Sequence, residues 1–224
     1  TDYLNSGGPE GTQWIVGQCD VSIRPGWFYH SDQDSLVKTP QQLVDIYYKS
    51  VGRNALLLLN LPPDKRGLIH ENDVKALTEF KTIIDESLST DLALGQNASA
   101  NNFRLEHSKF SPSNTLDGDS TTYWATDDGV FPATLEIELK EKTTLDRIMI
   151  QEPIRLGQRV SQFEIDLMDA NGWTTVFKGT TIGYKRILRI PEIKTSKVRL
   201  RILEANNTVA ISQLGLFKSS TQEN

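Results

Sequence analysis

The sequence predicts a multidomain α and β chain, with an α/β part over residues 1–90 and an antiparallel β-sandwich over residues 91–224. Two observations carry this prediction. Before residue 90, apolar strands alternate with amphipathic helices, as is typical of α/β layers. After it, short β-rich runs follow one another with no helical period between them. From Ser89 the composition turns to Ser, Thr, Gly and Asn, which marks the boundary.

The first half of the α/β part contains one predicted strand and one predicted helix. The apolar run Trp14–Val16 predicts a short buried strand that leads through Gly17 into a polar, aromatic-rich loop. Apolar residues then recur every three to four positions over Gln41–Val51, and Pro40 suits the first turn. This segment is therefore predicted to be an amphipathic helix.

The second half repeats the strand and helix order. Ala55–Leu61 holds consecutive apolar residues without alternation, which predicts a parallel strand covered on both faces; a buried helix segment is the weaker alternative. A second amphipathic helix is predicted over Asn72–Leu88, with Asn72 as its cap.

The second part is predicted to consist of strands joined by turns such as Asp169–Gly172. Such a series of strands without an intervening helix indicates an antiparallel β-sandwich. The predicted strands are Thr134–Leu139, Arg147–Gln151, Gln162–Met168, Thr174–Lys178, Lys185–Ile190, Lys197–Leu203 and Ile211–Phe217.

Composition restricts the class of protein. The chain has 224 residues, of which 38% are hydrophobic and 24% are charged, so it is globular rather than disordered. A net charge of −5 without a Lys/Arg cluster argues against a nucleic-acid or anionic-membrane partner. The single cysteine, Cys19, excludes an internal disulfide. No apolar run approaches the length of a membrane span, and the start at Thr1, without methionine, predicts a fragment.

The residues after the first predicted strand combine ring faces with hydrogen-bonding groups. Three successive aromatic residues, Trp27 to Tyr29, stand beside Asp20, Arg24 and His30. A sugar pocket needs both apolar faces and directional polar groups, so this segment is a candidate carbohydrate site. The structural alternative is a core strand followed by an aromatic turn.

The same segment carries a family resemblance. Asp20–His30, with the sequence Asp-Val-Ser-Ile-Arg-Pro-Gly-Trp-Phe-Tyr-His, closely resembles glycoside hydrolase family 29 α-L-fucosidases of the subfamily that acts on α-1,3 and α-1,4 branches. The resemblance implies that residues 1–90 form the C-terminal portion of a catalytic (β/α) TIM-like barrel. It also implies that Gln18, Asp20 and Asn60 lie at the C-terminal mouth of that barrel, where such enzymes place their sites.

A second resemblance covers Leu92–Lys218. Leu116–Trp124, Gly172–Trp173, Lys197–Ile202 and Ile211–Leu214 are similar to the discoidin, or factor 5/8 type C, jelly-roll. The resemblance implies that residues 91–224 are a discoidin-like β-sandwich and a candidate carbohydrate-binding module.

The first resemblance implies a retaining reaction, which uses two carboxyl groups about 5 Å apart. The nucleophilic aspartate is expected upstream of this chain. In the family pattern, a glutamate stands as acid/base where this chain has Gln18, and an amide cannot exchange a proton in the working pH range. Three explanations stay open: an engineered glutamine, a natural variant, or transfer of the role to Asp20, Asp32 or Glu10.

The candidate substrate-binding residues are Asp20, Arg24, Trp27 and Asn60. Each has a structural alternative: Arg24 can pair with Asp20, Trp27 can pack in the core, and Asn60 can simply end a strand.

The candidate metal ligands are Asp117, Asp119 and Thr122, whose oxygens suit calcium. A turn closed by side-chain to backbone hydrogen bonds explains the same residues equally well.

The resemblances predict part of a retaining exo-α-L-fucosidase that hydrolyses α-1,3- or α-1,4-linked fucose from branched Lewis-type glycans, with activity impaired by Gln18. No cofactor is expected for catalysis. The expected partners are fucosylated glycans and the N-terminal barrel portion of the same protein. A periplasmic or secreted location is favoured. The alternative is a non-catalytic glycan-binding or structural protein derived from that family.

Overall fold

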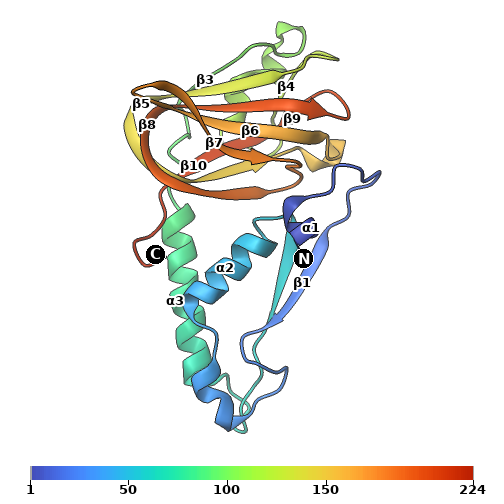
Figure 1. The fold of residues 1–224 in the computed structure, drawn as a ribbon. Helices are drawn as coiled ribbons and strands as arrows, with labels where there is room; N and C mark the ends of the chain where they lie inside the picture. Colours follow the sequence, from blue (N-terminus) through green and yellow to red (C-terminus); the bar gives the residue numbers. More distant parts are fainter. Residues whose placement is uncertain (1, 224) are drawn as a thin grey trace. The chain divides into compact units, whose positions relative to one another are not determined.

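The computed structural model describes residues 2–223, which form two compact units. Of the described residues, one unit contains 16–90 and 219–223, and the other contains 2–15 and 91–218. The expected order, an α/β part followed by an antiparallel β-sandwich, is confirmed (Figure 1). Among residues 2–223, no helix is long and apolar enough to cross a membrane.

The α/β unit is a strand–helix–strand–helix segment. Its elements are β1 (Gly17–Ser22), the 3-10 helix Ser31–Leu36, α2 (Pro40–Ser50), β2 (Ala55–Asn60) and α3 (Glu71–Leu88). The two strands pair in parallel, from Gly17 opposite Ala55 to Ser22 opposite Asn60. This is the repeating element of a (β/α) barrel, in which a helix joins neighbouring parallel strands.

Both predicted helices are confirmed, with one change of cap. Thr39 and Gln42 form a capping box around Pro40 at the start of α2. At the start of α3, His70 rather than the predicted Asn72 is the cap, because His70 Nδ1 accepts a hydrogen bond from the Asn72 backbone N–H at 3.2 Å.

The first strand begins at the residue after the apolar run, three residues later than predicted. The prediction of a strand over Trp14–Val16 was wrong, since β1 occupies Gly17–Ser22. The polar residues Gln18, Asp20 and Ser22 alternate with smaller or apolar ones, so they mark one face of a strand rather than a loop.

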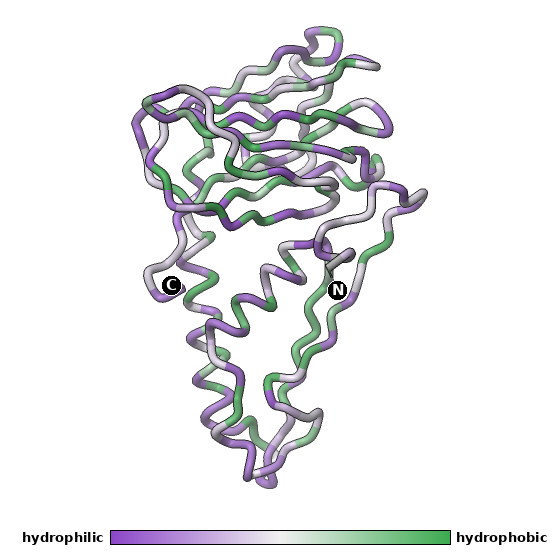
Figure 2. Tube along the Cα trace, viewed as in Figure 1, coloured by the Kyte–Doolittle hydropathy of each residue, from purple (hydrophilic) through white to green (hydrophobic). Residues whose placement is uncertain are grey.

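One face of the β1–β2 pair is covered and the other is exposed within this chain. On the covered face, Leu59 packs against Leu43 of α2 and Ala76 of α3. On the other face Leu56 and Leu58 are 57% and 53% exposed, although β2 is hydrophobic up to its last residue, Asn60 (Figure 2). The prediction that this strand is covered on both faces was therefore wrong for the described residues.

The second unit is built around an antiparallel sheet with the strand order β10-β5-β8-β6-β7, to which β3 adds by pairing with β5. A separate pair joins β4 to β9. The strands are β3 (Asn97–Ala100), β4 (Trp124–Ala125), β5 (Ala133–Gln151), β6 (Val160–Asp169), β7 (Gly172–Gly179), β8 (Arg186–Ala205), β9 (Ala210–Ile211) and β10 (Gln213–Phe217). The helical elements are α1 (Asp2–Ser6) and the 3-10 helices Arg104–Glu106, Ser108–Phe110, Pro112–Thr115 and Ile154–Leu156.

All seven predicted strand regions overlap strands of this unit, with differences in the bounds. Four of them merge into two, and Ile211–Phe217 is divided at Ser212 into β9 and β10. Strand β5 joins two predicted strands, and β8 joins two more. The pairing of β5 with β8 shifts register between Glu138 and Thr143 and again between Leu145 and Arg147. A bulge breaks the local alternation of a strand that continues, so one long strand resembles two short ones in the sequence.

The core of the sandwich contains fully buried aliphatic and aromatic side chains, among them Leu135, Ile148 and Phe163. Trp124 is also fully buried, and its indole N–H donates to the Asn102 carbonyl oxygen at 2.9 Å. The Trp173 ring lies under the Arg199 guanidinium, 4.3 Å from the ring centroid. Trp124 therefore packs in the core of the sandwich.

A buried carboxylate holds two loops of the sandwich. Glu152 is 2% exposed, and its carboxylate accepts hydrogen bonds from the backbone N–H groups of Arg159, Val160 and Gly183. Burial raises the pKa of Glu152 to about 7, and these N–H donors and the Arg159 charge only partly oppose the effect.

We expect the pKa of Glu152 to appear in the stability of the protein. The folded state holds the proton up to about pH 7, whereas an unfolded chain releases it near about pH 4.3. Between these values the folded state binds more protons, so the free energy of unfolding should fall as pH rises, by up to about 4 kcal/mol. Chemical denaturation at pH 5 and pH 8 measures this slope. Glu152→Gln should reduce it, and an unchanged slope in the variant would contradict the assignment.

Candidate functional site

The loops that follow the C-terminal ends of β1 and β2, residues 23–30 and 61–70, are called the loop platform below. Ser22 and Asn60 are paired at these ends. Asn60 Nδ2 donates to Ser22 Oγ and to the Trp27 carbonyl oxygen, both at 3.0 Å. One amide thus ties the end of each strand to the loop that carries the aromatic residues. Parallel strands of a barrel place their functional loops at this edge.

Two of the predicted site residues lie away from this edge. Gln18 and Asp20 are the second and fourth residues of β1, opposite Leu56 and Leu58. Their side chains are exposed, and Gln18 Nε2 donates to Asp20 Oδ1 at 2.7 Å. Both were expected just past the end of a strand, but β1 begins before them and continues to Ser22. Of the three residues expected at the mouth, Asn60 is the one at a strand end.

Arg24 is fully buried beneath the loop platform. Its Nε donates to Asp73 Oδ2 at 2.9 Å and its Nη1 to Asp34 Oδ1 at 3.0 Å. Burial opposes its charge, but the hydrogen bonds to both carboxylates outweigh that effect and raise the pKa of Arg24. The ion pair expected with Asp20 is thus replaced by one with α3 and one with the 3-10 helix.

Trp27 lies on the exposed side of the same loop. Its side chain is 54% exposed, and that of Phe28 is 79% exposed. Within the described residues, Trp27 therefore does not pack in the core. An exposed indole ring offers an apolar face of the kind that stacks on sugar rings.

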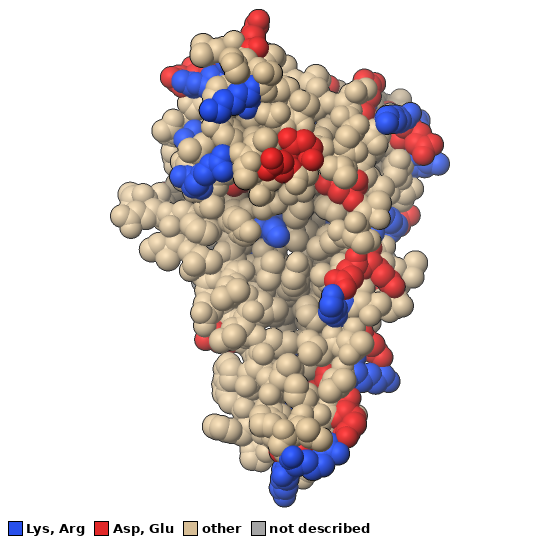
Figure 3. All heavy atoms as spheres, turned by 180° about the vertical axis from the view of Figure 1, so that it is seen from behind, with Lys and Arg blue, Asp and Glu red and all other residues tan. Residues whose placement is uncertain are grey.

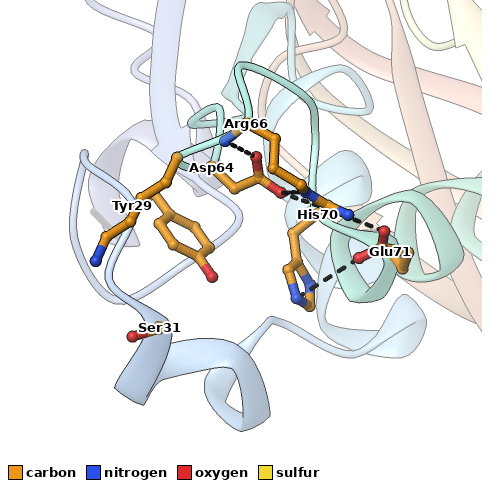
Figure 4. A pocket seen from close by; sticks show the side chains of 7 residues that line it. Tyr29, Ser31, Asp64, Arg66, His70 and Glu71 are labelled. Carbon is orange, nitrogen blue, oxygen red and sulfur yellow. Dashed lines mark hydrogen bonds and ion pairs between the residues drawn. The ribbon is translucent and has the colours of Figure 1, made fainter.

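A pocket opens between the loops that follow β1 and β2 (Figure 4). Its volume is about 250 Å³, and its lining residues are Tyr29, Ser31, Asp64, Lys65, Arg66, His70 and Glu71. Arg66 Nη2 binds Asp64 Oδ2 at 2.6 Å and Glu71 Oε1 at 2.8 Å. The hydrogen bonds from Arg66 hold the pKa of Asp64 below its usual range.

Sequence reasoning missed this pocket. Tyr29 comes from the loop after β1, whereas Asp64 and His70 come from the loop after β2. The charged run Asp64–Arg66, shortly after the end of β2, was the sequence signal for it. Polar residues that follow neighbouring parallel strands lie at the same edge of the sheet.

The candidate calcium loop is closed by its own hydrogen bonds. Thr122 Oγ1 donates to Asp117 Oδ2 at 2.7 Å, and the backbone N–H groups of Asp119 and Thr121 donate to Asp117 Oδ1 and Asp119 Oδ1, both at 2.8 Å. Such hydrogen bonds are those of the closed turn that was the alternative to a calcium site. The loop oxygens fit calcium in ligand type, but residues 2–223 contain no group of three or more His, Cys, Asp or Glu placed to hold a metal.

Charged side chains of both signs are interspersed on the face drawn in Figure 3. Charges of opposite sign pair along α3, for example Lys75 with Glu79 at 3.9 Å. This surface pattern offers no extended field of one sign.

Two family models match the chain in the same order as its two parts. Residues 5–85 match the model described as alpha-L-fucosidase, and residues 96–214 match the F5/8 type C domain. Alpha-L-fucosidase 1 of Arabidopsis thaliana is 38% identical over 96% of this chain and 43% of its own length. A relative from Oryza sativa subsp. japonica is 39% identical over 98% of this chain and 42% of its own length. The chain thus spans less than half the length of these relatives.

Solved structures agree with this match. A Ruminococcus gnavus GH29 fucosidase in complex with fucose superimposes with a TM-score of 0.90 at 32% identity, over 97% of this chain and 44% of that one. The SpGH29 crystal structure gives a TM-score of 0.89 at 39% identity, over 98% and 47%. A chitosan-binding module from a Paenibacillus chitosanase/glucanase gives 0.51 at 25% identity, over 57% and 97%.

The Arg24–Asp73 pair gives a test of what holds the loop platform. Asp73→Ala would leave the Arg24 charge buried without its main partner, so the free energy of unfolding should fall by about 3 to 5 kcal/mol. Chemical denaturation measures this change. Asp85→Ala, which removes a partner of Lys81 on the exposed side of α3, is the matched control and should leave stability close to its starting value.

A double variant tests whether the stability lost in Asp73→Ala comes from the unpaired charge of Arg24. Replacing both partners, Arg24→Met with Asp73→Leu, removes the unpaired charge and should recover part of the stability lost in Asp73→Ala. A double variant less stable than Asp73→Ala would contradict a pair dominated by charge.

Proposed function

From the membership of residues 5–85 in the alpha-L-fucosidase family and of residues 96–214 in the F5/8 type C domain family, we propose that this chain is the C-terminal part of an enzyme that hydrolyses α-linked L-fucose. The observation that carries the proposal is the parallel β1–β2 pair inside the fucosidase segment. Its C-terminal ends carry an exposed indole ring and a polar pocket, the two features that a sugar site requires.

The finer proposal concerns substrate and stereochemistry. The Asp20–His30 segment resembles the fucosidases that act on α-1,3 and α-1,4 branches, so Lewis-type glycans are the proposed substrates. Retention would require two carboxyl groups about 5 Å apart, one to attack the anomeric carbon and one to protonate the leaving oxygen. The nucleophile is proposed to lie upstream, and no residue of this chain is assigned that role.

We also propose that an upstream barrel portion covers the exposed face of β1 and β2. Leu56 and Leu58 are more than half exposed on that face. Burying such apolar surface stabilises a fold by roughly 25 cal/mol per Å². The chain spans 42% and 43% of the lengths of its plant relatives, which leaves room for the remaining strands.

The acid/base role expected at Gln18 is a separate proposal, and the fold gives it little support. Ser22, at the C-terminal end of β1, lies four residues beyond Gln18, a distance of about 13 Å along a strand. A substrate bound at the C-terminal mouth would be met by the strand ends and the loops after them. We therefore favour a different carboxyl group as the acid/base.

The alternative is a non-catalytic glycan-binding or structural protein. The similarity of the sandwich to a chitosan-binding module favours a glycan-binding role for residues 91–224. This alternative predicts binding of fucosylated glycans without release of fucose.

Hydrolysis of a Lewis-type trisaccharide by the complete protein tests the proposal. We expect release of L-fucose, with the α-anomer formed first in an NMR time course. Gln18→Glu should change turnover by less than about threefold, because position 18 lies away from the mouth. A rise of about 10² or more would place the acid/base at position 18. Binding without release in both forms would favour the alternative.

We propose calcium as an optional ligand of the Asp117, Asp119 and Thr122 loop. A bound ion would stabilise the sandwich, so calcium added after chelation should raise the melting temperature of the wild type. Mg²⁺ serves as the control ion, since it demands a smaller, octahedral site. Asp117→Asn should abolish the calcium effect, and no shift in the wild type would refute the site.

A further inference from the structure

We propose that the pocket lined by Tyr29, His70 and Arg66 binds the hydroxyl groups of the neutral sugar next to fucose in the substrate glycan. This inference rests on the proposed fucosidase function and adds a second sugar subsite to it. Nothing in the sequence singled out His70 or Arg66 for this role. Their placement around one opening comes from the fold (Figure 4).

The pocket lies at the edge of the barrel segment where a substrate would arrive. Its residues come from the loops that follow β1 and β2 and from Ser31 and Glu71, the first residues of the helices after those loops. Asn60, at the end of β2, binds the carbonyl oxygen of Trp27 in the first of these loops. The pocket and the exposed indole ring of Trp27 therefore belong to the same loop platform.

Arg24 and Asp34 hold the Tyr29 side chain in place. The Arg24 guanidinium lies 4.7 Å from the centroid of the Tyr29 ring. The Tyr29 hydroxyl donates to Asp34 Oδ2 at 3.3 Å, and Asp34 is itself bound to Arg24. With its proton committed to Asp34, the phenol oxygen keeps lone pairs that can accept a hydrogen bond from a sugar hydroxyl. Arg24 is thus a positioning residue, not a sugar contact.

His70 presents the complementary donor. Its Nδ1 accepts the Asn72 backbone N–H that caps α3, so the proton of the neutral ring lies on Nε2. Nε2 lies 3.4 Å from Asp34 Oδ2 and 3.7 Å from Glu71 Oε2. These separations are too long for strong hydrogen bonds, so a sugar oxygen can take the N–H.

Charge and size select the class of ligand. Asp64 and Glu71 contribute two negative charges to the lining and Lys65 and Arg66 two positive ones, so the lining is neutral overall when His70 is neutral. A neutral polyhydroxylated ligand suits this balance better than an anion. The volume of about 250 Å³ lies below the roughly 300 to 1,000 Å³ of pockets for drug-sized ligands, as expected for one sugar ring.

The test compares two substrates of the complete protein. One is a fucosylated trisaccharide, and the other is an aryl α-L-fucoside that lacks the second sugar. His70→Asn removes the Nε2 donor while asparagine can still cap α3, and Tyr29→Phe removes the hydroxyl alone. In each variant, kcat/KM for the trisaccharide divided by kcat/KM for the aryl fucoside should fall about 3- to 10-fold, as for the loss of one neutral hydrogen bond.

Lys75→Ala, on the exposed side of α3, is the matched control and should keep the wild-type ratio. Thermal melting of each variant detects loss of folding, which would lower both substrates together and leave their ratio unchanged. A ratio within twofold of wild type in both pocket variants would overturn the proposal.

Failure of the proposed function can be told apart from failure of the subsite. If the wild type hydrolyses neither substrate, the fucosidase proposal fails, and calorimetric titration with the trisaccharide and with free L-fucose replaces the kinetics. A 3- to 10-fold loss of affinity for the trisaccharide relative to L-fucose in His70→Asn would support the subsite. Equal affinities in the wild type and the variant would overturn it.

Discussion

The loop platform of the α/β unit depends on one buried guanidinium. Arg24 follows the end of β1, and its partners are Asp73 in the first turn of α3 and Asp34 in the 3-10 helix between β1 and α2. Burying an ion pair costs desolvation energy, so its value lies in geometry rather than in net stability. Asp73 also lies near the N-terminus of α3, where the helix dipole favours a negative charge. The loop after β1 is thereby fixed to α3 and to the 3-10 helix.

The helices of this unit could be predicted from the sequence, but the bounds of its first strand and the site could not. Helices α2 and α3 have apolar residues at helical spacing, and this signal is contained within each segment. The ion pair of Arg24 and Asp73 joins residues 49 positions apart, and no local pattern identifies such a partner. For this reason Arg24 was assigned to the substrate, although its side chain lies behind the pocket rather than in it.

The sandwich shows the same limit in another form. Strands β6 and β8 pair Glu164 with Arg201 and Asp166 with Arg199, and Arg201 also binds Asp166. Burial alone would raise the pKa of Asp166, but hydrogen bonds from Arg201, Thr175 and Arg199 outweigh it and hold the pKa at about 2. The alternating pattern predicts that these positions share one face of the sheet. It does not reveal that charged partners across the strands allow carboxylates to be buried there.

The position of a strand boundary decides which residues can reach a substrate. The apolar run Trp14–Val16 suggested a strand that ends before Gln18, which would place Gln18 at the barrel mouth. Because β1 instead spans Gly17–Ser22, Gln18 lies in its first half, next to Asp20 on the same face. The place of a motif residue within its strand is thus set by the strand boundary and not by the motif itself. Beyond the strand ends, the loops after β1 and β2 place Tyr29 and His70 around one opening.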